Sequence, residues 1–188
     1  MPIKIFIDQG HNPQNPNAGA EGNGYREQDI TYRIGTDLAA LLNANPDFSA
    51  RLSRTNSTQV LGTSNNSSLA ARANAANAWG ADYFISLHTN SATSPLASGS
   101  EAFVYSAASP AYELANEILL QISRATGLTN RGVFVRPGLY VLKKTQMPAL
   151  LLEMGFITNP NDANLMANQP ELFAQAIYQG ILNYFGLG

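Results

Sequence analysis

The chain has 188 residues, enough for one domain with its own hydrophobic core. Hydrophobic residues make up 45% of it and charged residues 13%, which excludes a disordered, charge-driven segment. Eleven Lys and Arg against thirteen Asp and Glu give a net charge of -2, so the basic surplus typical of nucleic-acid binding is absent and we expect no nucleic-acid partner. The chain has no cysteine and only two histidines, so imidazole and carboxylate groups would have to hold any metal.

Short apolar runs alternate along the chain with segments of helical periodicity. The expected strands are residues 3–8, 48–53, 81–88, 99–105, 133–136, 140–142 and 149–154. The expected helices are residues 27–43, a segment capped by Ser68 that runs to Trp79, and residues 110–127, 160–168 and 170–185. Strands that alternate with helices predict an α/β fold with a mostly parallel sheet. Because no linker or repeat divides the chain, we expect a single domain over residues 1–188.

The segments between these elements are polar. Residues 10–24 are rich in Gly, Asn and Pro and predict a long loop after the first strand, and residues 54–67 predict an exposed loop. Ser109 followed by Pro110 is typical of a helix start. No apolar run has the roughly eighteen residues of a membrane helix and no signal peptide is visible, so we expect no membrane insertion.

Both histidines fall at strand ends. His11 follows the first strand and His88 ends the strand over residues 81–88. Open α/β sheets place ligands at the carboxyl ends of their strands, so both imidazoles map to one edge of the sheet. A single loop histidine is more often only a hydrogen-bonding group. The pairing makes a shared metal ion an equally good interpretation.

Two carboxylates lie close to these histidines in the expected fold. Glu27 begins the helix over residues 27–43 and is the candidate third ligand, because catalytic zinc takes three protein groups and leaves one position for water. Its alternative role is that of an acidic first-turn residue favoured by the helix dipole. Asp8 could bind the metal or orient His11, and we favour the orienting role.

Glu153 interrupts the apolar segment of residues 149–156. Ionised groups are rarely buried unless they are paired or bound to a metal, so this position calls for a reason. An ion pair with Arg72 or Arg131 is the structural alternative, and we favour a catalytic role. Two imidazoles, one carboxylate and one spare carboxylate that takes a proton from water form the set needed for metal-assisted hydrolysis.

Several longer motifs surround these residues in a characteristic order. They include Ile7-Asp8-Gln9-Gly10-His11, Gly24-Tyr25-Arg26-Glu27, Ser86-Leu87-His88-Thr89-Asn90, Gly99-Ser100-Glu101, Asn130-Arg131-Gly132-Val133 and Glu153-Met154-Gly155-Phe156-Ile157-Thr158-Asn159. Over residues 3 to 183 the chain resembles the zinc-dependent N-acetylmuramoyl-L-alanine amidases of the Amidase_3 type, which cut bacterial peptidoglycan.

The resemblance implies a twisted, mostly parallel sheet of about six strands with helices on both faces. It implies Zn²⁺ bound by His11, Glu27 and His88, with Glu153 as general base and then proton donor. The substrate would be the amide bond between N-acetylmuramic acid and L-alanine. Peptidoglycan would be the partner of a monomer that acts outside the cell, in the periplasm or at the cell wall, as a domain of a larger exported protein or as a phage lysin.

Other details bear on the substrate site. Asn12 and Pro13 stand where the family usually has glycine after the first histidine. The polar residues Asn90, Asn130 and Arg131 are candidates for substrate contacts, although a solvated surface is an equally good interpretation of each. Some family members carry an inhibitory helix between the second histidine and the Gly-Ser-Glu strand. Residues 89–98 are too few for such a helix, so we expect an open site that needs no activator.

Two other classes of protein could use some of these histidine and carboxylate residues. An iron(II) oxygenase also binds its metal with two histidines and one carboxylate, but its usual all-β barrel does not fit alternating helices. A non-catalytic peptidoglycan-binding module with a vestigial metal site would have no use for Glu153. Replacing Glu153 would therefore distinguish a binding module from an amidase.

Overall fold

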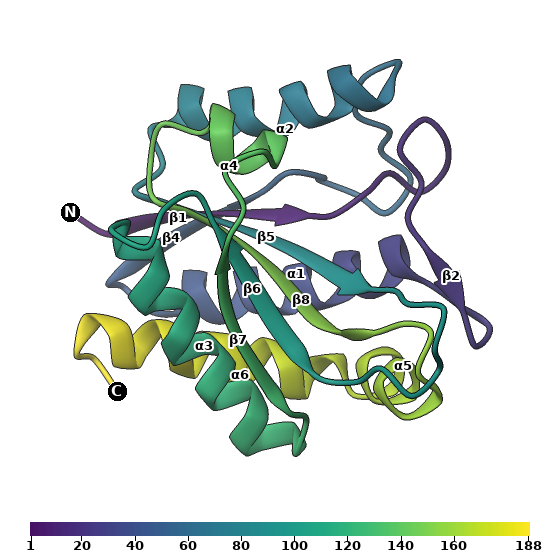
Figure 1. Ribbon diagram of the computed structural model, residues 1–188. Helices are drawn as coiled ribbons and strands as arrows, with labels where there is room; N and C mark the ends of the chain where they lie inside the picture. The colour runs from purple at the N-terminus through teal and green to yellow at the C-terminus, as the bar shows by residue number, and fades with distance from the viewer.

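The computed structural model describes all 188 residues, which form a six-stranded sheet between two layers of helices (Figure 1). The strands are β1 (Ile3–Gln9), β2 (Glu21–Gly22), β3 (Tyr25–Arg26), β4 (Phe48–Leu52), β5 (Tyr83–Asn90), β6 (Ser100–Val104), β7 (Asn130–Val135) and β8 (Ala149–Phe156). The helices are α1 (Glu27–Ala44), α2 (Asn65–Trp79), α3 (Pro110–Thr126), α4 (Tyr140–Lys144), α5 (Pro160–Asn168) and α6 (Pro170–Phe185).

The large sheet has the strand order β4-β1-β5-β8-β6-β7, and β2 and β3 form a separate hairpin. Every neighbouring pair in the large sheet is parallel except β6 and β8. The predicted α/β fold with a mostly parallel sheet of six strands is therefore confirmed. Because β6 and β7 run against the other four strands, they begin at the edge where β1, β5 and β8 end.

Both faces of the sheet are buried. Ile5 and Ile7 of β1 belong to a core of 29 buried residues shared with α1, α3 and α6, whereas Phe6 between them belongs to a core of 8 residues shared with α2 and α4. Successive strand residues point to opposite faces, so β1 contributes to both cores. Figure 1 shows α2 and α4 on one side of the sheet and α1, α3 and α6 on the other. This double burial explains the uninterrupted apolar run at the start of β8.

One expected element was wrong, and the start of another was misplaced. The strand expected at residues 140–142 is part of the short helix α4, whose Val141 and Leu142 are buried in the smaller core. A short apolar run does not distinguish a strand from a buried helical turn. Helix α2 begins at Asn65, because the Ser64 side chain accepts a hydrogen bond from the Ser67 backbone N at 3.1 Å and caps the helix.

The start of the expected exposed loop at residues 54–67 was also wrong, because Arg54 is fully buried. Ser68, which was expected to cap α2, is buried inside that helix. The start of α3 is confirmed, since Ser109 caps it and Pro110 is its first residue. None of the helices combines the length and the apolar character needed to cross a membrane.

Candidate metal centre

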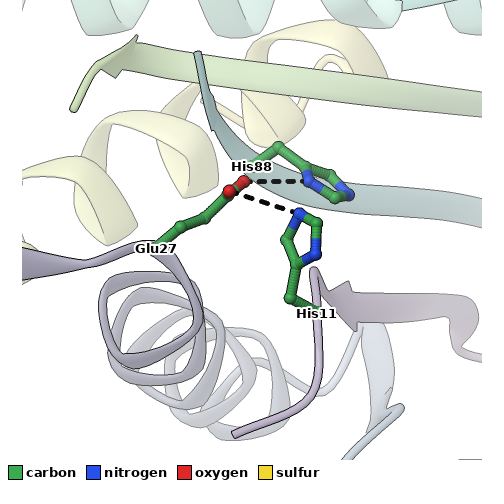
Figure 2. Close-up of side chains that lie close together, drawn as sticks. All are labelled: His11, Glu27 and His88. Carbon is green, nitrogen blue, oxygen red and sulfur yellow. Dashed lines mark hydrogen bonds and ion pairs between the residues drawn. The ribbon is translucent and has the colours of Figure 1, made fainter. Parts of the chain in front are cut away.

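Three side chains from distant parts of the sequence meet at the edge of the sheet (Figure 2). His11 lies in the loop after β1, Glu27 is the first residue of α1 and His88 lies near the end of β5. His11 Nε2 is 3.2 Å from Glu27 Oε2, and His88 Nδ1 is 3.1 Å from Glu27 Oε1. One potential ligand atom from each residue lies within 4.8 Å of the other two. The structure therefore brings together the three predicted metal ligands.

Backbone amides hold the Glu27 carboxylate in position. Its Oε1 accepts a hydrogen bond from the Thr89 backbone N and its Oε2 accepts one from the Ala20 backbone N, both at 2.9 Å. Burial opposes ionisation of Glu27, but hydrogen bonds from His11 and His88 and their charges lower its pKa well below the ordinary range. Glu27 is therefore an ionised carboxylate held in position, which suits the role of metal ligand better than that of a first-turn residue alone.

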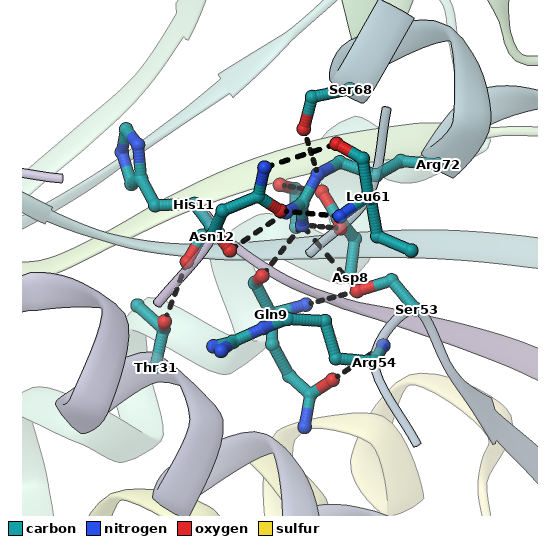
Figure 3. A network of polar contacts seen from close by, with 12 residues as sticks. Asp8, Gln9, His11, Asn12, Thr31, Ser53, Arg54, Leu61, Ser68 and Arg72 are labelled. Carbon is teal, nitrogen blue, oxygen red and sulfur yellow. Dashed lines mark hydrogen bonds and ion pairs between the residues drawn. The ribbon is translucent and has the colours of Figure 1, made fainter. Parts of the chain in front are cut away.

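The loop that carries His11 is fastened to α2 by a buried arginine (Figure 3). His11 has a φ of 69°, a left-handed conformation that few residues other than glycine adopt. Arg72 Nη2 donates to the His11 carbonyl oxygen at 2.7 Å, and Arg72 Nη1 donates to the Gln9 carbonyl oxygen at 2.6 Å. These contacts fix the backbone that carries the His11 ring.

Asp8 is linked to the His11 loop through Arg72. Its Oδ1 accepts a hydrogen bond from Arg72 Nη1 at 2.6 Å and its Oδ2 accepts one from Ser86 Oγ at 2.7 Å. Both carboxylate oxygens thus have partners, and neither contacts the His11 ring. Asp8 therefore supports the His11 loop through Arg72, an indirect form of the orienting role that we favoured.

Gly10 allows the close approach of β1 and β5. Its backbone N donates to the Leu87 carbonyl oxygen at 2.9 Å. A Cβ at this position would lie 2.6 Å from His88 Cε1 and 2.7 Å from His88 Nε2. Only glycine leaves the His88 ring its present position, which is the physical reason for glycine before His11.

Glu153 lies beside His88 in the sheet. In the register of β5 and β8 it is paired with His88, and in the register of β6 and β8 it is paired with Glu101. Its Oε2 is buried and has no hydrogen-bond partner. Neither Arg72 nor Arg131 forms an ion pair with it, so the structural alternative considered for Glu153 was wrong.

The environment of Glu153 favours its protonated form. Burial, together with the charges of Glu27 and Glu101, raises the pKa of Glu153 to about 8. A carboxyl group with a pKa near neutrality can both take and return a proton. Its orphaned oxygen is therefore suited to general acid–base chemistry beside the three clustered ligands.

Glu101 is a functional candidate to which the sequence analysis assigned no role. Its Oε1 accepts a hydrogen bond from Asn90 Nδ2 and its Oε2 accepts one from Arg131 Nε, both at 2.8 Å. Two of the predicted substrate-contact residues are thus held by one carboxylate next to Glu153. The third, Asn130, lies at the start of β7, where its Oδ1 accepts a hydrogen bond from the Gly132 backbone N at 2.9 Å.

The donor set fits a divalent transition metal ion. Two imidazoles and one ionised carboxylate match the three protein ligands of a catalytic zinc site. His11 Nδ1 and Glu153 Oε2 are both buried and have no hydrogen-bond partner. A buried polar atom without a partner is costly unless a ligand or water satisfies it. These residues therefore fit a metal ion, although they do not select zinc over iron.

The chain resembles known proteins over most of its length. Residues 5–183 match the family model of Amidase_3, N-acetylmuramoyl-L-alanine amidase. The chain is 37% identical to the sporulation-specific N-acetylmuramoyl-L-alanine amidase of Bacillus subtilis, over 96% of this chain and 66% of that protein. It is 36% identical to the amidase LytC of the same organism, over 96% of this chain and 35% of that protein. The chain thus spans less than two thirds of the length of these curated relatives.

Solved structures agree with this match. The crystal structure of N-acetylmuramoyl-L-alanine amidase from Clostridium difficile 630 superimposes with a TM-score of 0.87 at 30% identity, covering 98% of this chain and 97% of that one. The catalytic domain of CwlV from Bacillus (Paenibacillus) polymyxa superimposes with a TM-score of 0.84 at 28% identity, covering 99% of both chains. The family model, the curated relatives and the structures agree, and the chain belongs to the N-acetylmuramoyl-L-alanine amidase family Amidase_3.

Proposed function

We propose that this chain hydrolyses the amide bond between N-acetylmuramic acid and L-alanine in bacterial peptidoglycan, with Zn²⁺ held by His11, Glu27 and His88. The observation that supports this most directly is the buried, unpartnered Oε2 of Glu153 beside those three ligand groups. Family membership supports the choice of reaction and substrate.

The cluster has the parts that amide hydrolysis needs. When bound, a zinc ion supplies a Lewis acid that polarises the substrate carbonyl and lowers the pKa of a water from about 15.7 towards about 7. Glu153 accepts the proton of the attacking water. It then returns this proton to the departing nitrogen, because an amide nitrogen does not leave as an anion. A pKa of about 8 for Glu153 in the metal-free protein lies close to the range in which one group performs both steps.

The surrounding structure keeps these groups in place before substrate arrives. The backbone amides of Ala20 and Thr89 fix both oxygens of Glu27, and Arg72 fixes the backbone of His11. Mutation of residues that orient a metal's ligands typically lowers metal affinity or activity by about 10–100-fold. The site is therefore preorganised on the ends of rigid elements.

The segment between β5 and β6 supports an accessible site. Residues 91–99 contain no helix, and Asn159 Nδ2 donates to the Pro95 carbonyl oxygen at 2.9 Å. A segment of this length without a helix supports the proposal that the enzyme needs no activator.

We further propose that residues 1–188 work as one catalytic domain, as a monomer, at the cell wall. One relative at 29% identity is an endolysin of Bacillus phage SPP1, and others carry the names uncharacterized cell wall amidase, in Bacillus anthracis, and probable cell wall amidase LytH, in Staphylococcus saprophyticus. A structural neighbour, the CwlD amidase from Clostridioides difficile, was solved in complex with the GerS lipoprotein. Roles in an exported autolytic protein and in a phage lysin are both consistent with these relatives.

A non-catalytic wall-binding module is the second candidate function. A module of this kind needs the peptidoglycan surface but no proton-transfer group. The buried position of Glu153 next to His88 favours the amidase, because an unpartnered carboxyl group is costly to keep where it performs no reaction.

The decisive experiment is digestion of purified peptidoglycan by the zinc-loaded chain without any added protein. We expect new L-alanine amino groups and intact glycan strands. Glu153→Gln should abolish release of these groups while zinc and wall binding persist, and the exposed control Glu113→Gln should retain activity. New reducing sugar ends, or unchanged activity in Glu153→Gln, would overturn the proposed function.

A further inference from the structure

We propose that Arg131 recognises a carboxylate on the peptide part of the substrate, on the residue that follows L-alanine. This inference rests on the proposed function, because it takes Glu153 as the position of the bond that is cut. It assigns a substrate preference to a residue that contacts neither the metal ligands nor Glu153.

Arg131 is the extra residue of a β-bulge at the start of β7. In the register of β6 and β7, Ser100 is paired with Asn130 and Glu101 is paired with Gly132, so Arg131 has no partner on β6. Gly132 has a φ of 98°, which glycine adopts without strain. Bulges of this kind occur next to active sites, where they redirect a side chain. Here the bulge turns Arg131 towards Glu101.

The guanidinium group of Arg131 is held on two sides. Its Nε donates to Glu101 Oε2 at 2.8 Å, and its Cζ lies 5.0 Å from the centre of the Phe156 ring. A Cβ at Gly99 would lie 3.1 Å from Arg131 Cγ and 3.2 Å from Cδ, so glycine leaves room for the stem of the side chain. A guanidinium that is already fixed loses little conformational entropy when it binds a ligand.

Part of this group remains available to a ligand. Arg131 Nη1 has one long contact, 3.3 Å, to the Ser98 carbonyl oxygen, and Nη2 has no hydrogen-bond partner in the protein. The Arg131 side chain is 40% exposed, whereas that of Glu101 is 12% exposed. The salt bridge therefore occupies Nε, and Nη2 is left as a donor that a ligand can use. Carboxylates are the groups that an arginine fork binds most specifically.

The distance from the reaction centre selects one position of the substrate. His88, Glu153 and Glu101 are neighbours in one row across β5, β8 and β6, and Arg131 lies on the next strand. Strands are spaced by about 4.8 Å, so Arg131 lies about 10 Å from Glu153 along this row. An extended peptide advances about 3.5 Å per residue, so L-alanine and the residue after it span about 7 Å. The Arg131 side chain reaches back towards Glu101, which brings its guanidinium group within this span.

The charges around the reaction centre favour a cation at the position of Arg131, where it would help a substrate carboxylate to bind. Glu101 lies next to Glu153 in this row, and its carboxylate would repel a substrate carboxylate that passes it. Arg131 is the cation that contacts Glu101 in this row. It can attract the substrate carboxylate without contacting the metal ligands.

The test uses two muramyl peptides that differ at one group. In one, the residue after L-alanine has a free carboxylate, and in the other this group is a carboxamide. For the unaltered enzyme we expect kcat/KM to be about tenfold higher for the carboxylate. Arg131→Gln should remove this preference, mainly by raising KM for the carboxylate substrate. Any loss that acts through Glu101 should lower kcat/KM for both substrates by the same factor and leave the preference intact.

Arg136→Gln is the matched control. Arg136 follows β7 at its other end, and its Cζ lies 5.6 Å from the centre of the Phe103 ring. The control removes the same charge and a similar ring contact far from the row, and it should keep the full preference. An equal loss of kcat/KM on both substrates in Arg131→Gln would overturn the proposal, because it would show a role only in folding or in supporting Glu101.

A binding measurement separates this proposal from the proposed function. Calorimetry with two short peptides, L-alanine followed by a residue with either a carboxylate or a carboxamide, needs no turnover. Stronger binding of the carboxylate peptide that is lost in Arg131→Gln supports recognition by Arg131 even if the chain cuts no muramyl peptide. Equal binding of both peptides by the unaltered protein would overturn it.

Discussion

Arg72 connects the carboxylate of Asp8 to the backbone of His11. Arg72 Nη1 lies 2.6 Å from Asp8 Oδ1, and Arg72 Nη2 lies 2.7 Å from the His11 carbonyl oxygen. The side chains of Arg72 and Asp8 are each only 1% exposed. Removing one partner of a buried ion pair strongly destabilises the folded protein, because the other partner is left with an unpaired buried charge. The intact pair adds less to stability than this loss suggests. The folding of the chain and the position of a candidate ligand therefore depend on the same contact.

Asp8→Asn tests the stabilising part of this contact. Burial opposes ionisation of Asp8, but the charge of Arg72 and hydrogen bonds from Ser86 and Arg72 lower its pKa. The ionised form then stabilises the folded chain above the ordinary Asp pKa of about 3.9, and this stabilisation is lost as the pH falls through the lower folded pKa. We expect Asp8→Asn to lower the free energy of unfolding by about 3 kcal/mol at pH 7.

Urea unfolding at pH 7 and at stepwise lower pH measures this effect. The difference between the two proteins should shrink below about pH 4. Asp47→Asn, at an exposed position with no ion pair, should differ little from the unaltered chain at either pH. A gap between Asp8→Asn and the unaltered chain that stays constant down to acidic pH would contradict the role of the ionised carboxylate.

Zinc binding should raise thermal stability, and it should do so only while the ligand cluster is complete. A ligand at one hundred times its dissociation constant stabilises the folded state by about 2.7 kcal/mol. We therefore expect added Zn²⁺ to raise the melting temperature of the unaltered protein and of the control Glu113→Gln. His88→Ala and Glu27→Gln should lose most of this increase. An equal increase in all four proteins would place the bound ion elsewhere.

The sequence allowed the ligand cluster to be predicted because the relevant signals are local. His11 and His88 each follow an apolar strand, Glu27 begins a periodic helix, and Glu153 interrupts the most apolar strand. In a parallel sheet such positions meet at one edge, so strand ends alone bring them together. The α/β fold could be predicted for the same reason, since it follows from the alternation of strands and helices.

Other features depend on contacts between distant segments. Arg131 lies in a bulge that forms because the register of β6 and β7 shifts by one residue. The sequence of one strand does not show how it pairs with its neighbour, so the bulge could not be predicted. Arg54 was expected in an exposed loop, yet its Nη2 donates to the Gln28 carbonyl oxygen at 2.8 Å in the interior. Arginine is usually exposed, so a buried one is found only when its acceptors are known.

Glu153→Gln should stabilise the metal-free protein at alkaline pH. Burial and the charges of Glu27 and Glu101 raise the pKa of Glu153 to about 8, well above its unfolded value. A raised carboxyl pKa makes the folded state less stable as the pH rises, with the loss complete above about pH 8. Glutamine carries no charge, so the variant escapes this loss.

Melting temperatures of the two chelator-treated proteins between pH 5 and pH 9 measure the effect. The advantage of the glutamine variant should grow with pH and be smallest near pH 5. Added zinc should reverse the order at pH 8, because a cation favours the ionised form of Glu153 in the unaltered protein. A constant difference across this range would mean that Glu153 titrates normally.

Gly10→Ala should damage the candidate metal centre from outside the ligand set. The new Cβ would contact the Leu87 carbonyl oxygen and lie 2.6 Å from His88 Cε1, closer than packed atoms approach one another. The Leu87 carbonyl oxygen is part of the β5 backbone, which is paired with β8, so both this backbone and the His88 ring must shift. We expect lower stability, by about 1–3 kcal/mol, and a zinc affinity at least about tenfold weaker.

Gly138→Ala is the matched control, because no atom lies within 4 Å of a Cβ there, and it should bind zinc normally. Calorimetric zinc titration of both variants measures the difference, and normal affinity in Gly10→Ala would show that the ring of His88 is not a ligand or tolerates displacement.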